Sequence, residues 1–475
     1  MKKTILFAIS TIIFLLLCAI GLSQVKTVPS TMTRKHDPVQ VPGELLAPLI
    51  GKRLENLRLF SYRNGALSQM VYQFDERLAD GTFILNLGIT ANADKANKVL
   101  DFQDFLLFRI QDTGDRVPKD FWLTPEGVEI ELNDPLTGGK SYCYLFHFAN
   151  NPPDRLKDDT ISLGHWDPWK KSDLPFIVQG FSYIIEGYVN KIGNRYYKTA
   201  LNKTFYVPKK AGGTNVNLLD GMRLRAFVEL FFGKTRLEFN EHNLIGGIDA
   251  INQGSVRGFG LQWLTAALPM GLEGPRMYSD VFTYDRIVVA PMKIHIPIDP
   301  KKIITRAGIE YGYDLSEAAY GMKYYSVNCH DGVVIDGKMS EQEKSMPTKW
   351  SPWFIITGPQ GSLIFRVYLQ KGMLEQVKAN TYFIDDRSQA FPPESISGSI
   401  GYGRNIVEIT SVKPGLYDAR IEWYFPPHFY KNNTYDKEEL KQFFNILDNP
   451  IVIKASGKSA KNEALNPPKL YPKKS

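Results

Sequence analysis

Cysteine is scarce in this 475-residue chain, which has three cysteines in all. Cys18 lies in an apolar N-terminal segment, so Cys143 and Cys329 are the two that follow it. Neither belongs to a C-x-x-C or C-x-x-C-H pattern, which excludes covalent c-type haem attachment and thioredoxin-like redox chemistry. In an oxidising compartment Cys143 and Cys329 could form one long-range disulfide, and two separate buried thiols fit the sequence equally well.

Established catalytic signatures are also lacking. The sequence contains no G-x-S-x-G elbow, no H-E-x-x-H, no P-loop and no EF-hand loop. The glycine-rich stretch from Gly254 to Gly260 does not have dinucleotide-binding spacing. Seven histidines permit a β-sandwich that holds haem non-covalently through Met and His, but they do not indicate one. We therefore expect no cofactor and no metal. The catalytic residues stay unknown, and the sequence leaves open whether the protein is an enzyme.

A strong excess of one charge is missing as well. The chain has 57 Lys and Arg against 50 Asp and Glu, a formal net charge of +7, and part of that excess comes from lysines at the two termini. Basic residues elsewhere are interspersed with acids, so we expect no nucleic-acid partner. After the N-terminal segment no apolar run is long enough to cross a membrane as a helix.

The N-terminus has the pattern of a secretory signal. Lys2 and Lys3 precede an apolar run from Ile5 to Leu22, which is the order that export signals require. Gly21 and Ser23 supply small residues where signal peptidase needs them, so we expect cleavage after Ser23. The protein would then be exported, to the periplasm or the extracellular space. A membrane anchor is the alternative, because the run approaches the roughly 20 residues that span a bilayer.

The remaining chain indicates an all-β fold, mostly antiparallel. Hydrophobic residues make up 43% of the composition and aromatics 12%, which is enough for a substantial core. Val128, Ile130 and Leu132 alternate with glutamates before a turn-rich stretch, a pattern typical of a hairpin strand. The one convincing helix runs from Lys437 to Leu447. We expect a large β-sandwich, or two to three packed β-sandwich units, with this one C-terminal helix.

Composition shifts divide the chain into six predicted parts. They are a signal peptide (1–23), an extended lead-in (24–43), an N-terminal β domain (44–150), a central β domain (160–345), a C-terminal β domain with the helix (346–456) and a Lys/Pro-rich tail (457–475).

Tryptophans in polar, proline-bearing connectors are the first candidate ligand-binding residues. Trp166 and Trp169 form one pair, and Trp350 and Trp353 form a second. An indole in such a connector can stack on a sugar ring, because it offers apolar area together with an N–H donor. The alternative is that each pair closes the end of a sandwich.

A second candidate is an acid/base cluster at the end of a predicted strand, formed by Glu238, Glu241 and His242. Such a trio can transfer protons or bind a metal. A solvated strand end is the simpler interpretation.

These observations favour an exported binding or structural protein of the cell envelope that holds a glycan through loop aromatics. The partner would be a glycan or an envelope protein. The alternative is a polysaccharide-active enzyme, a lyase or a hydrolase, on a β-sandwich scaffold.

Overall fold

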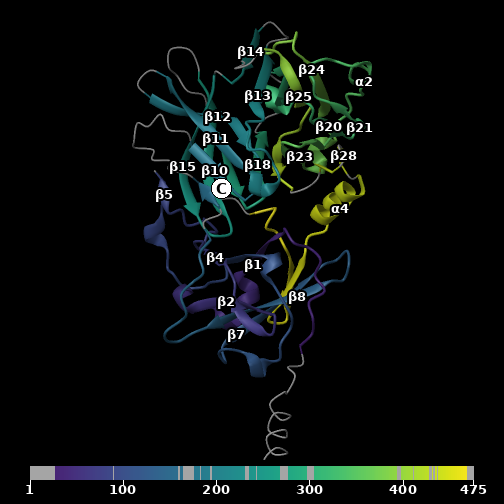
Figure 1. Cartoon of the computed structure of the whole chain (residues 1–475). Helices are drawn as coiled ribbons and strands as arrows, with labels where there is room; N and C mark the ends of the chain where they lie inside the picture. Colours follow the sequence, from purple (N-terminus) through teal and green to yellow (C-terminus); the bar gives the residue numbers. More distant parts are fainter. Residues whose placement is uncertain are drawn as a thin grey trace, which may run out of the picture.

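The computed structural model describes residues 27–88, 90–158, 161–163, 176–181, 183–192, 195–230, 235–241, 243–267, 277–296, 304–392, 397–409, 411–426, 430–431, 434–435 and 437–467. The predicted signal peptide lies outside these residues. Within them, the chain forms a smaller N-terminal lobe and a larger lobe, drawn at the bottom and the top of Figure 1. No helix among the described residues is long and apolar enough to cross a membrane.

The N-terminal lobe contains two antiparallel sheets. In spatial order, the first consists of β1 (Pro38–Pro42), β6 (Phe105–Arg109) and β4 (Tyr72–Asp75). The second has six strands, β3 (Ala66–Gln69), β2 (Leu57–Arg63), β8 (Lys140–His147), β7 (Gly127–Asn133), β29 (Val452–Ala455) and β30 (Lys458–Lys461).

The larger lobe is built on a fourteen-stranded sheet and a five-stranded sheet. The larger sheet runs β21 (Cys329–Val334), β20 (Lys323–Ser326), β22 (Trp353–Gly358), β23 (Gly361–Leu369), β26 (Gly415–Tyr424), β18 (Ile287–Ile296), β17 (Met277–Thr283), β16 (Gly258–Ala266), β15 (Leu244–Gln253), β12 (Arg195–Tyr206), β11 (Ile184–Ile192), β10 (Phe176–Gln179) and β9 (Ser162–Leu163), with β5 (Leu87–Gly88) on β15. The smaller sheet runs β14 (Thr235–Phe239), β13 (Leu219–Leu230), β19 (Ile304–Leu315), β25 (Ser399–Glu408) and β24 (Lys378–Asp386). A two-stranded ribbon pairs β27 (Tyr430–Lys431) with β28 (Thr434–Tyr435).

The four sheets other than the two-stranded ribbon form a stack, with a hydrophobic cluster between each neighbouring pair. One cluster joins the six-stranded and three-stranded sheets, and includes Val41, Leu106 and Ile130. The next joins the three-stranded and fourteen-stranded sheets, and includes Leu107 and Phe282. A third fills the space between the fourteen-stranded and five-stranded sheets. The all-β, mostly antiparallel prediction is therefore confirmed.

The predicted hairpin is confirmed as β7 and β8, and the alternation of apolar and acidic residues along β7 explains it. Val128, Ile130 and Leu132 are buried while Glu129 and Glu131 remain half-exposed on the opposite face. In the connecting turn, Asp134 Oδ1 accepts a hydrogen bond from the Leu136 amide at 3.0 Å. This Asx-type bond is the local reason that the chain reverses there.

The sheets are continuous across two of the predicted domain boundaries. The fourteen-stranded sheet contains strands from both sides of residue 345, since β20 pairs with β22 and β18 pairs with β26. Near the C-terminus, β29 pairs with β7 of the N-terminal lobe, and β30 includes residues from the predicted tail. The proposed division into folding units stays a prediction, because a shared sheet does not show which parts fold independently.

The predicted C-terminal helix is confirmed as α4 (Lys437–Asp448). Phe443, Phe444 and Leu447 lie on one face of α4 and pack against the cluster between the lobes. The other α-helices in the described part of the chain, α2 (Glu341–Lys344) and α3 (Lys371–Leu374), have four residues each.

A buried arginine joins the two lobes. Arg257, the residue before β16, is fully buried and its Nε donates to Asp75 Oδ2 of β4 at 2.6 Å. Its Nη1 donates to Gln40 Oε1 of β1 at 2.8 Å and to the Tyr284 hydroxyl at 3.1 Å. The Phe282 ring lies 4.9 Å from the guanidinium carbon. The charge is thus paired and hydrogen-bonded, as a buried charge must be.

We expect Asp75→Ala to lower the free energy of unfolding by about 3–5 kcal/mol, because it leaves the Arg257 charge buried without its partner. Urea denaturation measures the change. Glu55→Ala is the matched control, since it removes the Arg53–Glu55 pair, whose side chains are 62% and 65% exposed, and exposed pairs contribute little. Equal losses in the two variants would contradict the role given to Arg257.

Candidate functional site

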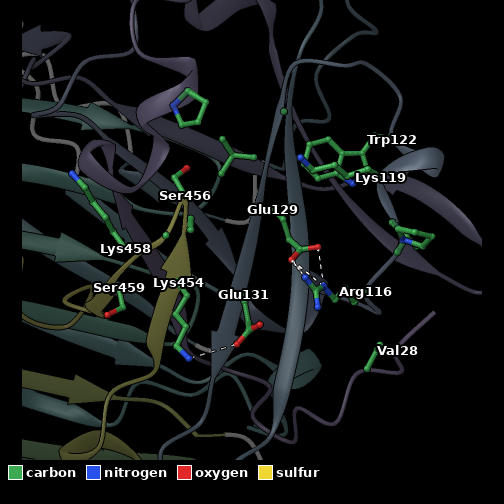
Figure 2. A pocket seen from close by; sticks show the side chains of 17 residues that line it. Val28, Arg116, Lys119, Trp122, Glu129, Glu131, Lys454, Ser456, Lys458 and Ser459 are labelled. Atoms are coloured by element: carbon green, nitrogen blue, oxygen red, sulfur yellow. Dashed lines mark hydrogen bonds and ion pairs between the residues drawn. The ribbon is translucent and has the colours of Figure 1, made fainter. Parts of the chain in front are cut away.

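A groove of about 810 Å³ lies on the outer face of the six-stranded sheet. We call it the basic groove, and Figure 2 shows the side chains that line it. Its volume is in the range of ligand-binding clefts. The lining residues come from both ends of the chain: Val28, Pro48, Arg116, Val117, Pro118, Lys119, Trp122, Gly127, Val128, Glu129, Glu131, Lys454, Ala455, Ser456, Gly457, Lys458 and Ser459.

The floor of the basic groove is formed by β7 and β29. Glu129 and Glu131 are two residues apart on one strand, so their side chains point to the same face. The register places Lys454 of β29 opposite Glu131. The turn after β29 consists of Ser456 and Gly457, with φ values of 50° and 77°. Two consecutive residues in the left-handed region are what a type I′ hairpin turn requires, and Gly457 adopts that region without strain.

One wall of the groove is the segment from Arg116 to Trp122. The Arg116 amide donates to the Val28 carbonyl and the Val28 amide donates back, both at 2.9 Å. The Trp122 ring packs edge-on against Tyr144 at 6.0 Å and Phe146 at 5.6 Å between ring centroids. Lys119 Nζ lies 5.3 Å from the Trp122 ring centre. These contacts hold an indole and a cation side by side at the edge of the groove (Figure 2).

The two floor carboxylates are paired with cations. Arg116 Nη2 lies 3.0 Å from Glu129 Oε1, and this ion pair raises the pKa of Arg116. Glu131 Oε1 lies 3.3 Å from Lys140 Nζ and 3.9 Å from Lys454 Nζ. Burial alone would raise the pKa of Glu131, but hydrogen bonds from Asn133 and Lys140 outweigh it, so the pKa is lowered.

This arrangement suits binding better than catalysis. A glycoside hydrolase needs one carboxyl group that stays protonated, with a raised pKa, beside one that is ionised. Glu131 has a lowered pKa and Glu129 is held by Arg116. Because its pKa is lowered, Glu131 is ionised at neutral pH and is not the protonated carboxyl group of such a pair. Among the described residues no group of three His, Cys, Asp or Glu side chains could hold a metal ion.

Trp350 and Trp353, the two predicted tryptophans that the structure describes, do not line this groove. Trp166 and Trp169 lie outside the described residues. Trp353, at the start of β22, packs against Phe444 of α4 with ring centroids 5.1 Å apart. Trp350 is half-buried and packs against the cluster on the other face of the fourteen-stranded sheet. Trp350 and Trp353 therefore do not share a surface.

The predicted acid/base cluster is divided among salt bridges in the described part of the chain. Glu238 is exposed and pairs with Arg236 at 2.6 Å. Glu241 accepts a hydrogen bond from the Leu224 amide at 3.0 Å and pairs with Arg225 at 3.2 Å. His242 lies outside the described residues.

Cys143 and Cys329 are both free and buried. Cys143 lies in the cluster of the N-terminal lobe, and Cys329 lies in the cluster between the two sheets of the larger lobe. The disulfide considered from the sequence is not formed, because the two thiols belong to different cores. Burial raises the pKa of each thiol.

A second group of charged residues lies where the lobes meet, and we call it the interlobe cluster: Arg109, Asp112, Asp158, Asp285 and Arg286. Arg109 pairs with Asp158 and lies 3.6 Å from Asp112. Arg286 Nε lies 3.7 Å from Asp285 Oδ2. Burial raises the pKa of Asp285 against the opposing effect of Arg286, and burial likewise raises the pKa of Asp112 against that of Arg109.

No direct signal for the basic groove is present in the sequence. The outward-facing Glu129 and Glu131 are visible as an alternation, but Lys454 and Lys458 are more than 300 positions further along the chain. Their approach depends on β29 joining the N-terminal sheet, which no local pattern indicates.

No protein-family model matches the sequence, and no curated protein matches it. The fold is similar to an alpha-mannosidase from Enterococcus faecalis V583, at 8% identity and a TM-score of 0.41, over 92% of this chain and 46% of that one. A glycosyl hydrolase family 38 protein from Enterococcus faecalis is similar at 8% identity and a TM-score of 0.40, over 90% of this chain and 47% of that one. Heparinase III-BT4657 is similar at 9% identity and a TM-score of 0.28, over 65% of this chain and 43% of that one.

The chain thus spans about half the length of the solved structures that it resembles. A likeness of this strength does not assign the chain to the families of those proteins.

We expect Trp122→Ala to lower the free energy of unfolding by about 2 kcal/mol, because the half-buried ring loses its contacts with Tyr144 and Phe146. Urea denaturation measures the loss. Leu123→Ala is the neighbouring control, since Leu123 is 48% exposed and should change stability little. If Trp122→Ala is as stable as the control, the indole does not support the wall of the groove.

Proposed function

We propose that the protein is an exported polysaccharide-binding protein of the cell envelope, and that its ligand lies in the basic groove. The groove itself carries the proposal, because it combines an indole, several cations and two serine hydroxyls on a rigid sheet. Saccharides present apolar ring faces and hydroxyl groups. Trp122 matches the ring faces, and Ser456 and Ser459 match the hydroxyls.

Export rests on the sequence of the first residues. Lys2 and Lys3 followed by the apolar run from Ile5 to Leu22 are the support for a cleaved secretory signal. A role for Trp166 and Trp169 in holding a glycan is part of the same proposal and rests on their place in a polar connector.

A polysaccharide-active enzyme is the second candidate, favoured by the interlobe cluster. Asp285 combines a raised pKa with a nearby arginine, Arg286, whose Nε and Nη1 are buried without a hydrogen-bond partner in the described structure. A carboxyl with a raised pKa is the group that a hydrolase uses as its general acid. Asp158, ion-paired with Arg109, would supply the second carboxylate of such a site.

We expect Ser459→Trp to abolish polysaccharide binding, because the new indole would fill the groove from the exposed strand β30. Isothermal titration against a panel of polysaccharides measures affinity. Ser68→Trp is the matched control, since Ser68 is exposed on β3, the opposite edge strand of the same sheet. Unchanged affinity in Ser459→Trp would place the ligand elsewhere, and absence of binding to every polymer by the wild-type protein would overturn the proposed function.

If the second candidate is correct, wild-type protein cleaves a polysaccharide and Asp285→Asn lowers the rate by about a hundredfold or more. Release of reducing ends, with the absorbance of unsaturated products as the lyase readout, measures the reaction. Asp80→Asn is the control, since Asp80 is an exposed loop carboxylate. Cleavage at the wild-type rate by Asp285→Asn would exclude Asp285 as the acid.

A further inference from the structure

The cations of the basic groove outnumber its acids. Four basic side chains line it, Arg116, Lys119, Lys454 and Lys458, against two acidic ones, Glu129 and Glu131. Lys140, just outside the lining, adds a fifth positive charge next to Glu131. The lining alone therefore carries a formal charge of +2, in a concave surface where the fields of neighbouring charges add.

Both acids are already neutralised within the protein. Arg116 pairs with Glu129 through a forked contact, with Nε at 3.0 Å and 3.2 Å from the two carboxylate oxygens. Glu131 accepts a hydrogen bond from Asn133 Nδ2 at 2.9 Å and lies beside Lys140 and Lys454. Its lowered pKa agrees with this surplus of positive charge. A ligand entering the groove would not meet an uncompensated negative charge.

Lys119 and Lys458 are the two groove-lining cations that do not pair with Glu129 or Glu131. In the described residues neither forms an ion pair with a carboxylate, and both are exposed. Figure 2 shows them on opposite sides of Glu129 and Glu131, so that they flank the floor of the groove. Lys119 also lies against Trp122, which places a cation next to an apolar ring face.

We infer that the basic groove selects an acidic polysaccharide, with Lys119 and Lys458 binding the carboxylate or sulfate groups of its sugars. This inference rests on the proposed polysaccharide-binding function and adds the charge of the ligand to it. A neutral sugar offers the two ammonium groups only hydroxyl acceptors, whereas a carboxylate or sulfate forms shorter and stronger charge-assisted hydrogen bonds with them.

The test uses polymers that share a backbone and differ in charge. Dextran, carboxymethyl dextran and dextran sulfate form one series, and polygalacturonate with its methyl ester forms another. We expect the acidic members to bind more tightly than the neutral ones, and added salt to weaken that binding. The carboxymethyl and sulfate members show which anion is preferred.

The Lys119→Gln/Lys458→Gln variant is expected to bind the acidic polymers about tenfold more weakly. Lys95→Gln/Lys209→Gln is the matched control, since it removes the same charge from exposed sites away from the groove and should bind like the wild type. Circular dichroism of both variants checks that the fold is retained.

Four results would overturn the inference. Equal binding of neutral and acidic members would remove the charge selectivity and leave the proposed function standing, while no binding to any polymer would remove both. Equal losses in the two double variants would show that net charge, rather than the groove, attracts the polymer. Binding to vesicles of anionic lipid in place of the polymers would make a membrane surface the partner.

Discussion

The buried guanidinium of Arg257 fixes how the two lobes of this protein meet. Taking a charge out of water costs several kcal/mol unless it is paired and hydrogen-bonded, so the groups around Arg257 cannot separate without a large loss. Asp75 and Gln40 reach it from the three-stranded sheet, while Tyr284 reaches it from the larger lobe. Gln73 completes the contact by accepting from the Arg257 amide at 2.8 Å.

The floor of the basic groove includes a hairpin that follows the larger lobe in sequence. The chain leaves that lobe through α4, and β29 and β30 then join the N-terminal sheet. Arg34 binds the segment between α4 and β29 to the N-terminal lobe, since its Nη2 donates to the Asn449 carbonyl and to Asp134 Oδ1, both at 2.7 Å. The pairing of β29 with β7 then places Lys454 opposite Glu131.

Local patterns in the sequence were sufficient for the all-β class, for the hairpin of β7 and β8 and for α4, but not for β1, β29 and β30. The alternation of Val128, Ile130 and Leu132 identified β7, because burial on one face and solvent on the other leave a period of two. The same patterns do not encode which strands become neighbours. The Ser456–Gly457 turn is a recognisable hairpin signal, yet its partner strand β7 lies more than 300 residues earlier.

Isolated side chains were harder to interpret from the sequence. Trp353 is in a proline-bearing stretch, but α4 supplies Phe444 to cover its ring. Glu241 is similarly used by Arg225 and by a backbone amide. In both cases the partner comes from a distant part of the chain. The residue type and its local context suggest a ligand site, but tertiary packing has already given the side chain a partner within the protein.

Hydrogen exchange of the wild-type protein, with and without an acidic oligosaccharide, tests whether the ligand binds in the basic groove. We expect slower exchange in residues 114–122 and 452–461 when the oligosaccharide is bound, and unchanged exchange in β14 on the far sheet. Protection confined to the loops around Asp285, with residues 452–461 unaffected, would contradict it and place the ligand between the lobes.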